Sequence, residues 1–532
     1  MKVAEKFSIS KSQVGRIKQS KESLRELQQS PSVLGKKRKR DQEQNDVGGA
    51  LAHWMTDKVA QGARLSGHLL KKKATELAAS KVWPDFIVSN QTGNYWTKIA
   101  ADFHTKVPFD GMWLDMNEIS NFVDGSISGC DNTSTYNNPP YLPGVAGGSL
   151  YKHTICPSAR HGKCRNYDVH NLYGMAETAV SYRTLKIIHK KRPFIISRST
   201  YPGQGHYGGH WSGDNSATFY DMYKSISAML HANMFGIPMT GSDICGFHLN
   251  TSSELCTRWH QLGAFYGFSR NHNADDCLPQ DPGQFDAESV ASTRRALRVR
   301  YSLLPFLYTL MWRSHVYGET VARPLLFEFP EDPVLENLDT QFMWGAALLI
   351  SPVLTQGARS VQAYFPGDVW YDFYTGWKLE IQHGRYVELS AELGHINLHM
   401  RGGHVIPMQQ PGLSTTLSRK NRFQLLVSLD VNMTAVGELY WDDGDSIDVY
   451  ESGEYNLLSF EATKNGLKSS VKHIGYLGEP MILGNVTVMG LSFTPSNVTM
   501  DGNLVTFSFK NSVLYISNLA VVFTETFEIV WH

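Results

Sequence analysis

The stretch Phe109-Asp-Gly-Met-Trp-Leu-Asp-Met116 is a short, almost continuous apolar run with a carboxylate, Asp115, at its end. Three later runs of the same kind end in Arg198, Asp243 and Arg270. Near-continuous apolar strands that alternate with helical stretches predict a parallel sheet covered on both faces. Charged residues at the carboxyl ends of successive strands are typical of the active-site face of a (β/α)8 barrel. The sequence therefore predicts an active site at this edge of the sheet.

Carboxylates and aromatic rings occur together in two of these segments. Asp115 has Trp113 and Glu118 beside it, and Asp214 lies next to Trp211 in the loop His210-Trp-Ser-Gly-Asp-Asn215. Two carboxylates in an aromatic-lined pocket suit glycosidic bond cleavage, in which one attacks the anomeric carbon and the other transfers the proton. Retention of configuration requires the two groups to lie about 5–5.5 Å apart.

A metal site is the alternative that these residues leave open, with Asp115, Glu118 and His272 as ligands. The sequence also contains two His-x-x-x-His pairs, His206/His210 and His395/His399. That spacing places both rings on one face only within a helix. The first pair spans a Gly-Gly loop, the second lies in a strand-like stretch, and neither has the zincin glutamate.

The domain organisation follows from the change of pattern along the chain. Residues 81–318 contain only about five strand–helix units, whereas a closed barrel requires eight, so we expect an incomplete barrel. Alternating strands with Gly, Asn and Asp turns follow, and they predict two β-sandwich domains, 319–410 and 411–532. The expected fold class is multidomain α/β plus all-β, preceded by a small all-α segment over residues 1–80.

Residues 1–80 differ from the rest in charge. They carry 17 basic and 8 acidic side chains, whereas the other 452 residues carry 33 and 42. Two short helices joined by a turn predict a helix-turn-helix segment that presents Ser12, Gln13 and Arg16 to base edges. The run Lys36, Lys37, Arg38, Lys39 and Arg40 is suited to holding phosphate or to serving as a nuclear-import signal. Duplex DNA is the expected partner of this segment.

The two parts of the chain resemble two different protein families. The segments "VAEKFSISKSQVGRIK", "KKRKR" and "ALAHWMTDKVAQGARLSGHLLKKKATELA" resemble the paired helix-turn-helix region of centromere protein B and the pogo/Tigger transposases. The motifs "DGMWLDMNEISNF", "RPFIISRST", "GHWSGDNSATF", "GSDICGF" and "LGAFYGFSRNHN" resemble glycoside hydrolase family 31, the group of lysosomal and intestinal α-glucosidases. The second resemblance implies a retaining, exo-acting α-glucosidase for α-linked gluco-oligosaccharides, which needs no cofactor and no metal.

The same resemblance implies roles for individual residues. Asp115 matches the nucleophile and Asp214 the acid/base, and Glu118 matches a residue that supports the site. The matching sugar-binding positions are Arg198, Asp243 and His272, and those that line the pocket are Trp113, Trp211 and Arg270. A disulfide between Cys245 and Cys256 is also implied. Packing remains the alternative role for Trp113 and Arg270, and a bracing role remains the alternative for Glu118.

The family's barrel begins before the strand of Asp115, and residue 81 enters it directly. A gene-fusion error that joins transposase-derived sequence to a truncated glycosidase explains this most simply. A DNA-binding chimera and an inactive glycan binder are the alternatives. We expect impaired catalysis in either case, because catalysis depends on accurate positioning.

The compartment signals conflict. Six cysteines and six Asn-x-Ser/Thr acceptors fit a secretory setting, and the acceptors begin at Asn90, Asn132, Asn250, Asn432, Asn485 and Asn497. The first residues contain no signal peptide, so the chain as written is expected in the cytosol or nucleus, and the parent glycosidase in the lysosome or outside the cell. No apolar run reaches the roughly 18 residues of a membrane-spanning helix.

Overall fold

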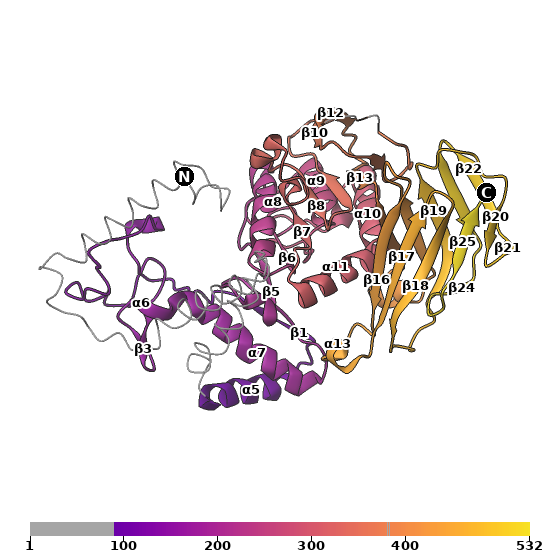
Figure 1. The fold of residues 1–532 in the computed structure, drawn as a ribbon. Helices are drawn as coiled ribbons and strands as arrows, with labels where there is room; N and C mark the ends of the chain where they lie inside the picture. The colour runs from indigo at the N-terminus through magenta and orange to yellow at the C-terminus, as the bar shows by residue number, and fades with distance from the viewer. Residues whose placement is uncertain (1–89, 380, 382–383) are drawn as a thin grey trace, which may run out of the picture. The chain divides into compact units, whose positions relative to one another are not determined.

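The computed structural model describes residues 90–379, 381 and 384–532, so the predicted helix-turn-helix segment lies outside the described residues. The residues that the structure describes belong to one compact unit. No helix within the described ranges is both long enough and apolar enough to span a bilayer. The helices of this part are α5 (Asn90–His104), α6 (Asn166–Val169), α7 (Tyr173–His189), α8 (Phe219–Met234), α9 (Ser253–Gly263), α10 (Ala287–Ser302), α11 (Leu304–Tyr317), α12 (Thr415–Arg419) and α13 (Val449–Ser452) (Figure 1).

A parallel sheet of four strands carries the predicted active-site edge. Its order is β1 (Gly111–Leu114), β4 (Phe194–Ser197), β5 (Gly209–Trp211) and β6 (Thr240–Gly241). All three strand pairs are parallel, which confirms the α/β class and the incomplete barrel within the described residues. Helix α7 packs beneath β1 and β4, where Leu185 contacts Leu114 and Ile195 in a small buried cluster.

The run that ends in Arg270 is not a regular strand. Helix α9 continues to Gly263, and the chain then turns, so only a short stretch is left to pair with the sheet. Two hydrogen bonds make that pairing, from Phe268 N to Thr240 O at 3.0 Å and from Ile244 N to Arg270 O at 2.9 Å. Arg270 therefore still reaches the same edge as the strand ends.

Side-chain caps fix the helices that follow the strands. Thr218 accepts from Asp221 N at the start of α8, Ser252 from Leu255 N at α9, and Asp286 from Ser289 N at α10. The sequence predicts one helix over residues 297–312, and the structure divides it into α10 and α11. Pro305 explains the break, because a proline fits the first turn of a helix but not its interior.

Two β regions follow the barrel part, as predicted. All strand pairs of the first are antiparallel, whereas the second also contains two parallel pairs. The first has a five-stranded sheet and a separate two-stranded sheet (β10 and β12). Its strands are β7 (Ala322–Arg323), β8 (Phe342–Trp344), β9 (Leu348–Ser351), β10 (Ser360–Phe365), β11 (Trp370–Asp372), β12 (Arg385–Ser390) and β13 (Asn397–Arg401).

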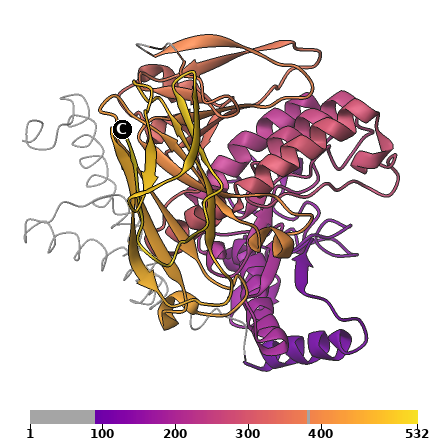
Figure 2. The same cartoon turned by 90° about the vertical axis from the view of Figure 1, so that its right-hand side faces the viewer.

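The second region is one 12-stranded sheet around a single core, in orange to yellow in Figure 2. Its first strand, His404–Gln409, lies before the predicted boundary at residue 410 but pairs with the next strand of this sheet. The strands are β14 (His404–Gln409), β15 (Phe423–Ser428), β16 (Ala435–Trp441), β17 (Asn456–Thr463), β18 (Gly466–Ile474), β19 (Ile482–Met489), β20 (Val498–Met500), β21 (Asn503–Leu504), β22 (Thr506–Lys510), β23 (Val513–Ser517), β24 (Val521–Val522) and β25 (Glu528–Trp531).

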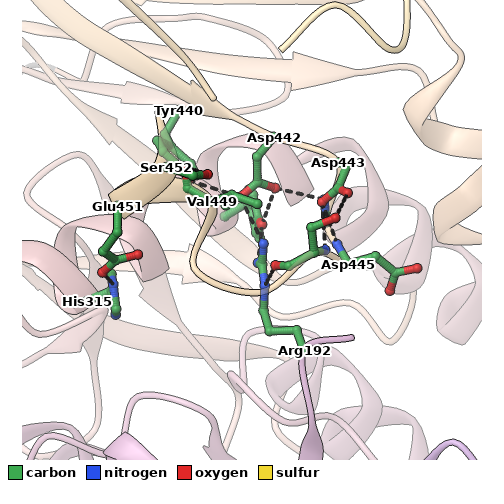
Figure 3. Close-up of polar contacts among 12 residues, drawn as sticks. Arg192, His315, Tyr440, Asp442, Asp443, Asp445, Val449, Glu451 and Ser452 are labelled. Carbon is green, nitrogen blue, oxygen red and sulfur yellow. Dashed lines mark hydrogen bonds and ion pairs between the residues drawn. The ribbon is translucent and has the colours of Figure 1, made fainter. Parts of the chain in front are cut away.

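A polar network joins the barrel part to this second β region (Figure 3). Arg192, which lies just before β4, donates from Nη2 to Asp442 at 3.0 Å and from Nη1 to the hydroxyl of Tyr308 at 2.7 Å. The hydroxyls of Tyr308 and Tyr440 donate to the same carboxylate at 2.5 and 3.0 Å. Asp442 is only 1 % exposed, so its charge is compensated by these donors rather than by water.

Replacing Asp442 by Asn keeps the side-chain shape and removes the charge that Arg192 compensates. We expect the free energy of unfolding to fall by about 3 kcal/mol, measured from the urea midpoint of the full chain. Asp445→Asn is the matched control, because its 2.7 Å ion pair with Lys191 is 62 % exposed on both sides and is screened by water. Equal midpoints for the two variants would contradict a stabilising role of the buried network.

Candidate active site

Arg198 is the residue around which the predicted site assembles. It follows β4, and its guanidinium Nη1 lies 3.0 Å from Asp115 Oδ1 and 3.6 Å from Asp214 Oδ2. Because both oxygens contact the same nitrogen at 3.0 and 3.6 Å, they are at most 6.6 Å apart. The two carboxylates come from the ends of β1 and β5, so the sheet brings together side chains that are 99 positions apart in the sequence.

Glu118 binds the Nε–Nη2 edge of the same guanidinium. Its oxygens accept from Arg198 Nε at 2.9 Å and from Nη2 at 3.2 Å, the two-point geometry that arginine forms with a carboxylate. Partial burial opposes the charge of Arg198, but these hydrogen bonds and the nearby negative charges outweigh it and raise the pKa of Arg198. Arg198 therefore carries a permanent positive charge among three carboxylates.

Asp243 and Arg270 form a second ion pair at this edge. Arg270 Nη2 lies 2.5 Å from Asp243 Oδ1, and the carboxylate is 1 % exposed. Burial raises the pKa of Asp243 to about 6, against the lowering effect of the Arg270 guanidinium. The second oxygen, Oδ2, is buried without a hydrogen-bond partner within the described part of the chain.

Aromatic rings hold Arg270 in place. Its guanidinium carbon lies 5.4 Å from the ring centre of Trp113, 5.3 Å from that of Trp211 and 5.7 Å from that of Phe268. Such contacts are favourable for a cation over a ring face. Trp211 is buried, whereas Trp113 is 51 % exposed and borders the site.

His272 lies against the same wall. Its ring centre is 5.7 Å from that of Trp113 and 5.2 Å from that of Phe247. Burial and the nearby positive charge of Arg270 lower the pKa of His272, so the ring is neutral near pH 7. The structure thus brings every sugar-binding and pocket-lining residue predicted from the sequence to one edge of the sheet.

Two amides at this edge, the buried Asn117 and the partly buried Asn215, have no role predicted from the sequence. Asn215 donates to the backbone oxygen of Asp243 at 3.0 Å, and Asn117 donates to Ser197 Oγ at 2.9 Å. Both lie inside quoted motifs, directly beside a predicted carboxylate. Their position next to Asp214 and Asp115 was the available signal, but the sequence does not show which neighbours such an amide contacts.

Four of the six cysteines form two disulfides in the structure. Cys245 and Cys256 form the disulfide that the resemblance implied, and Cys130 pairs with Cys156, a pair that the sequence left open. The described residues contain one group spaced for a metal ion, and it consists of this first disulfide and His260. Two of its three candidate donors are already bonded to each other. Asp115 and Glu118 both face the arginine.

This arrangement is equipped for cleavage between two sugar units. One carboxylate, Asp115, lies 3.0 Å from Nη1 of Arg198 and can serve as a nucleophile toward a sugar carbon. A second, Asp214, is within reach and 40 % exposed, so it can exchange protons with solvent. Buried polar groups such as Asp243 are suited to accept hydroxyl hydrogens.

The fold and the site agree with a known family. The chain matches the "Glycosyl hydrolases family 31 TIM-barrel domain" over residues 30–310 and the "Glycosyl hydrolase family 31 C-terminal domain" over residues 318–406. The chain therefore belongs to glycoside hydrolase family 31. The barrel match begins inside the predicted DNA-binding segment and includes Lys36–Arg40.

Individual relatives are similar along most of this chain. Lysosomal alpha-glucosidase of Bos taurus is 46 % identical over 466 residues, which cover 84 % of this chain and 49 % of the relative. Intestinal sucrase-isomaltase of Homo sapiens is 43 % identical over 463 residues, with 85 % and 25 % covered. The chain thus spans about half the length of the lysosomal relative and a quarter of the intestinal one.

A solved structure shows the same fold. The glucosidase II alpha subunit in its alpha3-Glc2-bound form has a TM-score of 0.73 and 27 % identity, and the match covers 84 % of this chain and 48 % of that chain. The similarity extends over most of the described residues, so the parallel sheet and the β regions are arranged as in this enzyme.

The raised pKa of Asp243 predicts a measurable pH dependence of stability. Its value of about 6, against an ordinary 3.8, means that the folded state holds the proton more tightly than the unfolded state. The resulting stability is fully present below about pH 4 and is lost as the pH rises through about 6. It amounts to about 3 kcal/mol, since one pKa unit corresponds to about 1.4 kcal/mol.

Urea unfolding of the wild type and Asp243→Asn between pH 4 and 7 measures this effect. We expect the wild type to lose stability relative to the variant over that range. If the stabilities of the wild type and the variant changed equally with pH, the pKa of Asp243 would not be raised in the folded state.

Proposed function

We propose that the protein is a retaining, exo-acting α-glucosidase, with Asp115 as nucleophile and Asp214 as acid/base. The observation that carries this proposal is the contact of both carboxylates with one nitrogen of Arg198. The distances of 3.0 and 3.6 Å put Asp115 Oδ1 and Asp214 Oδ2 at most 6.6 Å apart. Retaining enzymes need about 5–5.5 Å, and inverting enzymes about 6.5–9.5 Å. This upper bound supports the retaining mechanism over the inverting one.

The reaction proceeds in two displacements. Asp115 attacks the anomeric carbon while Asp214 protonates the departing oxygen, which gives a glycosyl ester on Asp115. Asp214, now a carboxylate, takes a proton from water, and the resulting hydroxide displaces Asp115 and restores the original configuration. Arg198 stays charged throughout and offsets the negative charge of the pair.

The remaining residues of the edge bind the sugar in this proposal. Asp243, Arg198 and His272 are placed to contact hydroxyls, and Trp113 offers a half-exposed ring for stacking against a sugar face. Glu118 acts on the sugar only through Arg198. In this proposal Glu118 braces Arg198 and does not contact the sugar.

Substrate class and location follow from the relatives. Their names point to α-linked gluco-oligosaccharides as substrates and to the lysosome as one location. The two disulfides fit an oxidising compartment. Lysosomal or secreted placement is therefore the location that we propose.

Release of 4-nitrophenol from 4-nitrophenyl α-D-glucoside tests the activity. We expect turnover by the full chain and a loss of at least about 1000-fold in kcat for Asp115→Asn and for Asp214→Asn. The control is Asp102→Asn on α5, a carboxylate whose ion pair with Lys98 is exposed. Sugar binding without turnover by the wild type would favour the inactive glycan binder instead.

The stereochemistry of the first product separates the two mechanisms. Proton NMR of early product should show α-glucose before mutarotation. Early β-glucose would indicate inversion and would remove Asp115 from the role of nucleophile.

Duplex DNA binding by residues 1–80 is the second candidate, and it rests on the excess of 17 basic over 8 acidic side chains in this segment. These residues lie outside the described part of the chain. With about five to nine phosphate contacts, affinity should fall steeply with salt. Fluorescence anisotropy should show this fall, together with weaker binding by Arg16→Ala, whereas binding that ignores salt would exclude the proposal.

A further inference from the structure

Asn117 is a buried amide that has no part in the reaction described above. It lies between Asp115 and Glu118 in the loop after β1 and is 3 % exposed. Its Nδ2 donates to Ser197 Oγ at 2.9 Å, and its Oδ1 accepts from Ser199 N at 3.0 Å. One side chain thereby ties the loop after β1 to the loop after β4.

The two serines flank Arg198. Ser197 Oγ donates to Ser199 O at 2.8 Å. Asn117, Ser197 and Ser199 therefore form a closed ring of hydrogen bonds around the backbone of Arg198. One backbone hydrogen bond to β1 also holds this residue, from Arg198 N to Leu114 O at 3.1 Å. Rotation of the loop is therefore restricted on both sides of the arginine.

Helix α7 supports this ring from below. The carboxylate of Glu177 on α7 accepts a hydrogen bond from the Asn117 amide, which ties the amide to this helix as well. Gly174 lies so close to Ser199 that a β-carbon at this position would be 2.6 Å from the Ser199 β-carbon. The helix thus approaches the loop as closely as the backbone allows.

We infer that Asn117 is a positioning residue that sets the guanidinium of Arg198 between the two catalytic carboxylates. The inference rests on the proposed function and deepens it. Arg198 meets three carboxylates at 2.9 to 3.6 Å, and a tilt of its backbone moves all of these contacts together. A misplacement of about 1 Å can lower a rate about 100-fold. The amide donates at one end and accepts at the other, and an aspartate of the same shape cannot do both.

Asn117→Asp is the test, because it keeps the volume and removes the donor to Ser197. We expect kcat to fall about 100-fold and KM to rise by a smaller factor, since Arg198 is only one of the three side chains placed to contact sugar hydroxyls. We also expect the pH profile of kcat/KM to change, because the distances between Arg198 and the two carboxylates change. An unchanged kcat and pH profile would overturn the inference.

Asn233→Asp is the matched control. This amide on α8 is also 3 % exposed, donates to Met229 O at 2.9 Å and accepts from Val321 N at 3.0 Å, and neither contact involves a residue of the site. It should lower the melting temperature as Asn117→Asp does and leave kcat and the pH profile unchanged. Equal losses of kcat in both variants would mean that general destabilisation explains the effect, and the inference would be wrong.

A crystal structure of the Asn117 variant separates this inference from the proposed function. We expect Arg198 Nη1 to lose contact with Asp115 or Asp214, and a guanidinium in its original place would overturn the inference even if the wild type shows no turnover. Asn117→Ala serves the same measurement if the aspartate variant does not fold. Absent turnover by the wild type counts against the proposed function alone.

Discussion

The contact between one guanidinium and three carboxylates at the end of β4 is the constraint on which the site depends. Like charges at this distance repel one another, and a positive centre that cannot lose its proton is the simplest way to hold them together. Arginine suits this task better than lysine, because its planar fork contacts Glu118 at two points and still reaches the other two acids. The parallel sheet serves to deliver these four side chains to one place.

Much of this site is predictable from the sequence, and the reason is physical. Apolar runs such as residues 109–114 predict strands of a parallel sheet, and parallel strands place their carboxyl ends at one edge, so Asp115, Arg198 and Asp243 are expected to meet. The roles of nucleophile and acid/base needed the family resemblance, because a spacing in sequence gives no distance across a sheet. The pairing of Cys130 with Cys156 depends on how two loops fold and is invisible to counting.

The differences between prediction and structure have local causes. The segment 264–270 is predicted as a strand from its apolar residues, but the preceding helix ends only at Gly263 and the chain turns through residues 264–268 before it reaches the sheet edge. Pro305 divides a helix that periodicity alone predicts as continuous. Asn117 carries no signal of its own, because its importance comes from two serines 80 and 82 positions away.

Asp243 shows what the buried ion pair means for recognition. Arg270 is held by three rings and satisfies only one carboxylate oxygen, and the other oxygen is buried without a partner among the described side chains. On the proposed function, a ligand hydroxyl supplies the missing hydrogen. A deoxy sugar that lacks this group leaves a desolvated anion unpaired, which is far less favourable than the loss of one ordinary contact. The preference for a sugar that carries this hydroxyl is therefore set by the buried ion pair, before any ligand binds.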